Sequence, residues 1–249
     1  MKYCALTDVG KKRSLNEDGY IADGNIFAVA DGMGGHRAGE VASIMALDIV
    51  RSELTKRSKE PVEQRITNAI KHANQAIHKR ATKDLDIRGM GTTLTVAVPS
   101  DGKLYAGHVG DSRLYLLRDG KLSQLTNDHS LVAQMVKSGH LKPEEAEVHP
   151  QRSIITRAVG SEAEVKVDTI VEEILFGDRF LLCTDGLNAM LSDDEIAEVL
   201  RDKTNITEAC RELISWANDR GGKDNITVIL FEPDTGASSR FGRLWRMGW

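Results

Sequence analysis

Runs of apolar residues, some continuous and some alternating with polar positions, predict strands along most of the chain. The first lies over residues 3–8. A pair over 20–30 is separated by Asp23-Gly24, a dipeptide that favours hairpin turns. Two further Asp-Gly turns, at 101–102 and 119–120, join three runs in the middle of the chain. The other strands are expected over 165–172, 179–184 and 225–232.

Other segments repeat their apolar residues every three or four positions, which is typical of helices that bury one face. Val41, Met45 and Ile49 mark such a helix. Pro61 is suited to open a second one, because the N–H group that proline lacks would be unpaired there anyway. Further helices are expected over 130–138, from the capping box of Ser192 and Glu195 to about 201, and over 207–219. The polar segment 139–153 is expected to form a surface flap. Antiparallel strands and paired helices therefore dominate the prediction.

Composition excludes several classes of protein. The chain has 249 residues, 41% hydrophobic, and a formal charge of -4, so nucleic acid is not an expected partner. We find no cleavable leader and no run of about 20 apolar residues, so we expect a cytoplasmic protein without a transmembrane segment. The three cysteines are widely spaced in apolar contexts and indicate reduced core thiols.

The last residues, 234–249, differ from the rest of the chain. They begin polar and then place Phe241, Trp245 and Trp249 at helical spacing with arginines between them. One interpretation is a flexible, frayed terminus. The other is a basic and aromatic segment that contacts an anionic membrane surface or a groove on a partner protein.

Acidic residues lie at the ends of three apolar segments that are distant in the sequence. Asp31 ends IFAVAD before a predicted helix, Asp185 ends RFLLCTD in the same way, and Asp224 precedes the last strand. Carboxylates brought together from such strand ends repel one another unless a cation lies between them. Oxygen-only ligands suit Mg²⁺ or Mn²⁺, and Gly32 would let a backbone carbonyl approach as a further ligand.

Two other segments add candidates. GKKRSLNEDG places Arg13 shortly before Glu17 and Asp18, and an arginine beside a metal cluster can grip a phosphate monoester. GHVGDSRLY adds Asp111, which taken alone is better explained by a turn or by an ion pair with Arg113 than by a metal site.

Two rival motifs fit less well. Gly32 and Gly34 begin a G-x-G-x-x-G dinucleotide loop, but Arg37 stands where the third glycine belongs. The pair Asp84 and Asp86 terminates a helical pattern rather than a strand, so it is expected to be a solvated helix end and not a phosphotransferase site.

The order of these motifs resembles the bacterial branch of the metal-dependent protein phosphatase 2C family. The resemblance covers about residues 3–232 and is carried by TDVGKKRSLNEDG, FAVADGMGGH, GMGTTLTVAV, GHVGDSRLY, ITRAVG, LLCTDGL and GGKDNITVIL. It implies an α+β fold, a four-layer α-β-β-α sandwich of two antiparallel sheets flanked by helix pairs. It also implies a catalytic domain over 1–233, followed by the tail 234–249.

The resemblance further implies a metal site with two tightly bound Mn²⁺ or Mg²⁺ ions. In the family's pattern Asp31 bridges both ions, Gly32 offers its carbonyl, and Asp185 and Asp224 ligate one of them. Asp18 with Glu17 would hold metal-bound water, and Arg13 would grip the phosphate. A third, weaker ion would fall on Asp111, with help from the flap near Ser153.

The implied reaction is attack of a metal-activated water on a phosphoserine or phosphothreonine ester. Animal members of the family tend to have histidine just after the Asp-Gly pair, where this chain has Met33, so His36 is the nearest candidate for the general acid. We expect a monomer that acts on phosphorylated proteins, among them the substrates of a bacterial serine/threonine kinase and the kinase itself. The alternative is a pseudophosphatase that binds phosphoprotein as a regulatory module.

Overall fold

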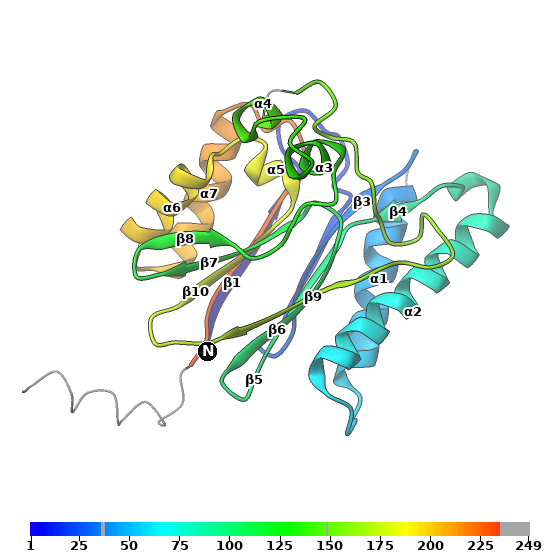
Figure 1. Ribbon diagram of the computed structural model, residues 1–249, viewed down its shortest axis with the longest axis horizontal. Coiled ribbons are helices and arrows are strands. Elements are labelled where there is room, and N and C mark those ends of the chain that lie inside the picture. Colours follow the sequence, from blue (N-terminus) through cyan, green and yellow to red (C-terminus); the bar gives the residue numbers. More distant parts are fainter. Residues whose placement is uncertain (36–37, 148, 235–249) are drawn as a thin grey trace, which may run out of the picture.

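The computed structural model of the chain describes residues 1–35, 38–147 and 149–234, which form four stacked layers (Figure 1). Two antiparallel sheets lie face to face, and a pair of helices covers the outer face of each sheet. The predicted α-β-β-α sandwich is confirmed. The tail over 235–249 lies outside the described residues.

The first sheet joins the two ends of the described chain. Its strand order is β1-β11-β10-β7-β8, so the first and last strands pair along their whole length. Its strands are β1 (Lys2–Asp8), β7 (Arg113–Arg118), β8 (Lys121–Gln124), β10 (Arg179–Cys183) and β11 (Ile226–Glu232).

The second sheet is built from the first half of the chain and one later edge strand. Its order is β2-β3-β5-β6-β9, and the short β4 pairs with the end of β3. Its strands are β2 (Asp18–Ala22), β3 (Phe27–Met33), β4 (Gly91–Thr92), β5 (Leu94–Ser100), β6 (Lys103–Val109) and β9 (Asp168–Glu173). The hairpins at Asp101-Gly102 and Asp119-Gly120 are confirmed, since both residues of each turn have positive φ, as type I′ turns require.

The predicted helices are present. The helices are α1 (Ala38–Thr55), α2 (Val62–Lys83), the 3₁₀ turn η1 (Leu85–Ile87), α3 (Leu131–Lys137), α4 (Pro143–Glu147), α5 (Asp185–Asn188), α6 (Asp193–Asp202) and α7 (Ile206–Asp219). Ser192 and Glu195 form the expected capping box of α6. Asp84 caps the end of α2 and Asp86 is exposed, as a solvated helix end should be.

The flap, residues 139–153, is less irregular than its sequence suggests, because it contains α4. The Lys142 N–H group donates to Glu145 Oε2 at 2.8 Å, which satisfies an N-terminal amide of this short helix. Proline at its first position also fits the helix without loss of a hydrogen bond. The three cysteines are free, as expected. Among the described residues, no helix combines the length and apolar character that a membrane crossing needs.

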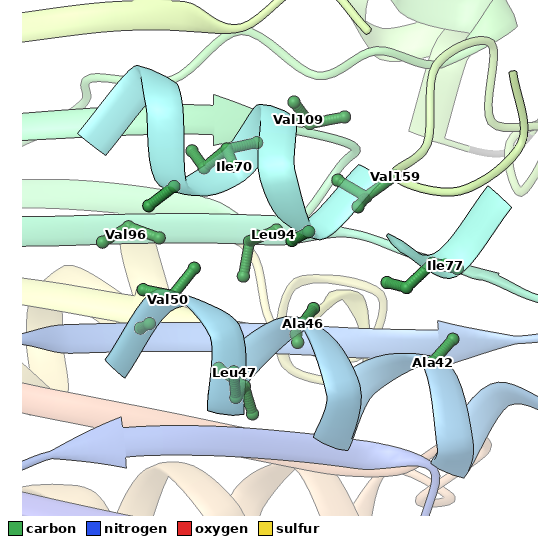
Figure 2. Packing of buried hydrophobic residues seen from close by; sticks show 14 of the residues in the cluster. Ala42, Ala46, Leu47, Val50, Ile70, Ile77, Leu94, Val96, Val109 and Val159 are labelled. Atoms are coloured by element: carbon green, nitrogen blue, oxygen red, sulfur yellow. The ribbon is translucent and has the colours of Figure 1, made fainter. Parts of the chain in front are cut away.

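Three apolar layers hold the sandwich together. One lies between α1, α2 and the second sheet, where Ala46 and Val50 face Ile70, Leu94 and their neighbours (Figure 2). A second lies between the first sheet and helices α6 and α7. The third lies between the two sheets and includes Phe27, Phe180 and Phe231. The rings of Phe27 and Phe231 stack with centroids 4.1 Å apart.

The layer between the sheets changes character along its length. Phe27 and Val29 of β3 face it, and the two-residue period of a strand brings Asp31 to the same face. In β11, Ile229 and Phe231 face it, so Thr227 does too. The layer is therefore apolar at the end near the N-terminus and polar at the other end, where α5 and the flap lie (Figure 1).

His108 is a fully buried polar residue of this layer. Its Nε2 lies 3.1 Å from the carbonyl oxygen of Asn127 and its Nδ1 lies 2.9 Å from Thr95 Oγ1. The carbonyl can only accept, so Nε2 carries the proton of a neutral ring. Burial, together with the neighbouring His129, lowers the pKa of His108 to about 4, although Asp128 and Asp168 act in the opposite direction.

We predict that His108 makes the protein sensitive to acid. As pH falls from 6.5 to 4, the unfolded chain protonates this ring before the folded protein does, which favours unfolding by up to about 3 kcal/mol. His108→Gln keeps a donor for Asn127 but cannot take up a proton. Urea unfolding at pH 7 and pH 5 should show a smaller loss of stability for the variant than for the wild type. An equal loss in both would mean that His108 is not the titrating group.

Candidate metal and phosphate site

Asp18 and Asp31 face each other across neighbouring strands. They form a directly opposed pair, in which Asp18 is the first residue of β2 and Asp31 lies two residues before the end of β3. The expectation that Asp31 ends its strand is wrong, because β3 continues through Gly32 and Met33, which pair with β4. This extension could not be predicted, since the partner residues Gly91 and Thr92 lie some sixty positions away in the chain.

Asp185 and Asp224 approach from the first sheet. Asp185 is the first residue of α5, just after β10, and Asp224 lies just before β11. A side chain at Gly186 would overlap the carbonyl oxygen of Asn225, so only glycine allows these two segments to come so close. The four acids predicted from distant strand ends, Asp18 included, therefore meet at the polar end of the layer between the sheets.

Two threonines that the sequence analysis missed hold Asp18 in place. The hydroxyl groups of Thr184 and Thr227 both donate to Asp18 Oδ2, at 2.8 and 2.7 Å. Thr227 belongs to the first sheet, Thr184 directly follows its strand β10, and Asp18 belongs to the second sheet, so these bonds cross between the sheets. In the sequence each appears only as a single threonine near the end of an apolar run. That pattern is too common to indicate a functional residue.

Asn225 is a third missed residue. Its Oδ1 accepts the Glu17 N–H group at 2.8 Å, and its Nδ2 donates to the carbonyls of Val9 and Leu15 at 3.0 and 2.9 Å. These bonds fasten the loop that carries Arg13 to the start of β11. Arg13 and Glu17 are thereby brought to the strand-end acids.

Gly32 lies where backbone segments meet at close range. Its N–H group donates to the Glu17 carbonyl at 3.2 Å, and any side chain on it would overlap the carbonyl of Gly39 in α1. Ser43 of the same helix also donates to the Glu17 carbonyl, at 2.7 Å. The start of α1 is thus packed directly against the Asp31-Gly32 pair.

Arg13 is bonded to one of the acids. Its Nη2 donates to Asp224 Oδ2 at 2.7 Å, and the arginine side chain remains half exposed. Arg152 of the flap is a second positive charge at this end, since together with Arg13 it opposes the rise in the pKa of Asp185. Arg13 and Arg152 thus place positive charge beside the acidic residues.

Asp111 lies in the loop between β6 and β7 and is 7% exposed. The alternative of an ion pair with Arg113 is not formed, because Arg113 donates instead to Asp128, at 2.7 Å, and to Tyr115. Ser153, expected to assist Asp111, lies exposed on the flap. Asp111 is thus buried beside the other acids, and its charge raises the pKa of Asp31.

The acidic cluster, as we call these residues, carries strongly perturbed acids. Its members are Glu17, Asp18, Asp31, Asp111, Asp185 and Asp224. Burial raises the pKa of Asp18 to about 7 and of Asp111 to about 8, and that of Asp31 well above its ordinary value. Burial and the charge of Asp224 raise the pKa of Asp185 to about 6. Burial and mutual repulsion thus disfavour the ionised form of these neighbouring carboxyl groups.

Unpaired oxygens test whether these residues suit a cation. Seven buried side-chain atoms of the described residues lack a hydrogen-bond partner, and four of them are carboxylate oxygens of Glu17, Asp18, Asp111 and Asp185. Hard oxygen donors of this kind fit Mg²⁺ or Mn²⁺. The side chains as they stand form no group of three that could already grip an ion, within the described chain. Arg13 donates to Asp224 Oδ2 and the Asn225 N–H group donates to Asp224 Oδ1, so a cation that took Asp224 as a ligand would compete with Arg13.

His36 and Arg37 lie outside the described residues. The assignment of His36 as general acid therefore stays a prediction. The remaining predicted site residues, Arg13, Gly32 and the acidic cluster, are all within the described chain.

The chain is similar to a family of known proteins. The sequence model of the family Protein phosphatase 2C matches residues 12–230. The serine/threonine phosphatase Stp of Listeria monocytogenes is 41% identical over 237 residues, which cover 92% of this chain and 94% of that protein. The serine/threonine protein phosphatase PstP of Mycobacterium tuberculosis is 40% identical over 230 residues, which cover 92% of this chain and 44% of that longer protein.

Solved structures show the same fold. The crystal structure of the M. tuberculosis phosphatase PstP superposes with a TM-score of 0.87 at 41% identity, covering 92% of this chain and 97% of that one. A crystal structure of the catalytic domain of PstP in complex with two manganese ions superposes with a TM-score of 0.85 at 38% identity, covering 92% and 96%. By its family match, its relatives and its fold, the chain belongs to the protein phosphatase 2C family of serine/threonine phosphatases.

Proposed function

We propose that the acidic cluster hydrolyses phosphoserine and phosphothreonine monoesters in proteins, with two tightly bound Mn²⁺ or Mg²⁺ ions and a weaker third. The observation that carries this proposal is the set of four buried carboxylate oxygens without a partner at one end of the sandwich. Such a set costs stability unless cations complete it. The PstP structure with two manganese ions supports the same number here.

The residues divide the work by position. Asp31 would bridge the two ions, the Gly32 carbonyl and the carboxylates of Asp185 and Asp224 would complete their ligands, and Asp111 would hold the third. Glu17 and Asp18 would orient water. When bound, the ions would lower the pKa of a water toward 7 and offset negative charge on the phosphate.

The chain's own side chains orient the reaction. Arg13 is half exposed and can turn its guanidinium from Asp224 to two phosphate oxygens, which fixes the ester for in-line attack. Thr184 and Thr227 keep Asp18 from moving, since both donate to the same oxygen. His36 is our candidate to protonate the leaving alkoxide. If so, His36→Gln should slow phosphothreonine-peptide hydrolysis far more than hydrolysis of p-nitrophenyl phosphate, whose leaving group needs no proton.

The wider setting is also proposed. The substrates would be proteins phosphorylated by a bacterial serine/threonine kinase, and the kinase itself. We propose a cytoplasmic monomer, with residues 1–233 as the catalytic domain. The tail 234–249 would be an accessory segment that contacts a membrane surface or a partner.

Metal dependence tests the proposed function directly. The purified chain should hydrolyse p-nitrophenyl phosphate and a phosphothreonine peptide with Mn²⁺ or Mg²⁺, lose both activities in EDTA, and recover them when the metal returns. A pseudophosphatase would bind the peptide without turnover. Full turnover in excess EDTA would refute the metal-dependent mechanism.

Asp31→Asn should separate activity from stability. The amide keeps the shape of the side chain but has no charge to bury and needs no proton to be neutral, so without metal the variant should unfold about 2–4 °C higher than the wild type. With Mn²⁺, activity should fall by more than the roughly 10–100-fold typical of residues that only support metal ligands. Thermal unfolding in EDTA and initial rates in Mn²⁺ measure the two effects.

The control for this pair of measurements is Asp86→Asn, at the exposed turn after α2, which should change neither quantity. If Asp31→Asn unfolded at a lower temperature than the wild type in EDTA, the carboxylates of the cluster would not be repelling one another.

Arg13→Ala should weaken phosphate binding without weakening metal binding. Loss of the guanidinium removes a bidentate phosphate contact, so kcat/KM should fall at least tenfold, about 1.4 kcal/mol. Because Asp224 no longer has to exchange an arginine, the Mn²⁺ concentration for half-activation should stay equal or decrease. Lys12→Ala, the exposed neighbour, is the matched control. An increased Mn²⁺ requirement in Arg13→Ala would instead place Arg13 in support of the metal ligands.

A further inference from the structure

His129 makes hydrogen bonds through both its backbone and its ring, and the proposed chemistry does not explain them. It lies between β8 and α3, and its side chain is 7% exposed. Its N–H group donates to the Gly110 carbonyl at 2.8 Å, and its Nδ1 accepts the Gly110 N–H group at 3.0 Å. One residue thus satisfies both backbone groups of the residue directly before Asp111.

The Gly110 position has little freedom of its own. Its φ is +113°, and a side chain there would lie 2.6 Å from Thr93 Cβ. Thr93 in turn binds Asp31, whose N–H group donates to Thr93 Oγ1 at 2.9 Å. A shift of Gly110 would therefore displace Asp111 against the strand that carries Asp31.

The same residue holds the returning end of the flap. The Thr156 N–H group donates to the His129 carbonyl at 2.7 Å. The next residue, Ser130, bridges to Ile155, and the Leu131 N–H group donates to the Ile154 carbonyl at 2.9 Å. The base of the flap is therefore paired to the segment that begins with His129.

The far side of the ring is anchored as well. The Nε2 atom of the ring lies 3.2 Å from Asp168 Oδ2 and 2.7 Å from Arg157 Nη1. Arg157 also donates to Asp168 Oδ1 at 2.7 Å. The ring of His108 packs against the ring of His129, with the two ring centroids 4.8 Å apart. These neighbours fix the orientation of the ring.

We propose that His129 is a positioning residue that makes the Asp111 loop and the base of the flap move as one unit. The side chain sets the place of Asp111 through Gly110, and the backbone sets the place of the flap through Thr156. If the proposed function holds, this coupling would keep the third cation and the flap in register during turnover. That consequence rests on the proposed function. The coupling itself does not.

Two substitutions separate the two ends of the ring. His129→Asn places an amide oxygen near the Nδ1 position and can still accept the Gly110 N–H group, but it cannot reach Asp168. His129→Gln reaches toward Asp168 and leaves the Gly110 N–H group without its acceptor. Loss of a buried hydrogen bond of this kind corresponds to about a tenfold change in an equilibrium. His72→Gln, which changes an exposed histidine on α2 away from Gly110 and the flap, is the matched control.

The first measurement is amide hydrogen exchange by NMR on the full chain in EDTA. In His129→Gln, the amides of Gly110 and Thr156 should both exchange about tenfold faster than in the wild type. In His129→Asn and in the control, both amides should exchange at the wild-type rate. Faster exchange at Gly110 alone would overturn the coupling. Equal exchange in both His129 variants would overturn the role of Nδ1.

The second measurement is the Mn²⁺ dependence of phosphothreonine-peptide hydrolysis. The Mn²⁺ concentration for half-activation should rise about tenfold in His129→Gln, while KM for the peptide and the requirement of His129→Asn stay near wild type. An unchanged requirement in His129→Gln would overturn the link to Asp111. An inactive wild type would refute the proposed function instead, and the exchange experiment would still decide the coupling.

Discussion

The repulsion among buried carboxylates is the constraint on which the rest of the structure depends. Six acids are gathered at one end of the layer between the sheets, and burial raises the pKa of five of them. They stay close together because hydrogen bonds from neighbouring groups hold them in place. The hydroxyl groups of Thr184 and Thr227 fix Asp18 from the opposite sheet, and Asn225 fixes the backbone of Glu17.

The opposite end of the same layer supplies the compensation. Phe27, Phe180 and Phe231 stack there between the sheets, and apolar residues fill the layers under both helix pairs. Burial of apolar surface stabilises the fold by about 25 cal/mol for each Å². A strand of seven residues, such as β3 or β11, is long enough to contribute to the apolar end with its one half and to the polar end with its other half.

Much of the fold could be predicted because its signals are local. Asp-Gly turns, the capping box at Ser192 and the spacing of apolar residues are all read within a few positions of each other. The acids at strand ends could also be identified from their immediate neighbours in the sequence. The family resemblance then assigned their roles. What could not be predicted depends on contacts distant in sequence. Thr227 gains its role only from Asp18, and Arg113 was available to Asp111 until the fold paired it with Asp128.

The bonds from Thr184 and Thr227 to Asp18 also set a condition on how the protein is made. Thr227 lies 209 positions after Asp18, in the last strand of the described chain. While the ribosome is still adding residues before β11, the acids of β2 and β3 have emerged but lack the strand that holds them, and β1 lacks its partner. A nascent chain should therefore have no competent centre until β11 has left the ribosome. Dephosphorylating activity would then appear only once the whole sandwich, including its last strand, can fold.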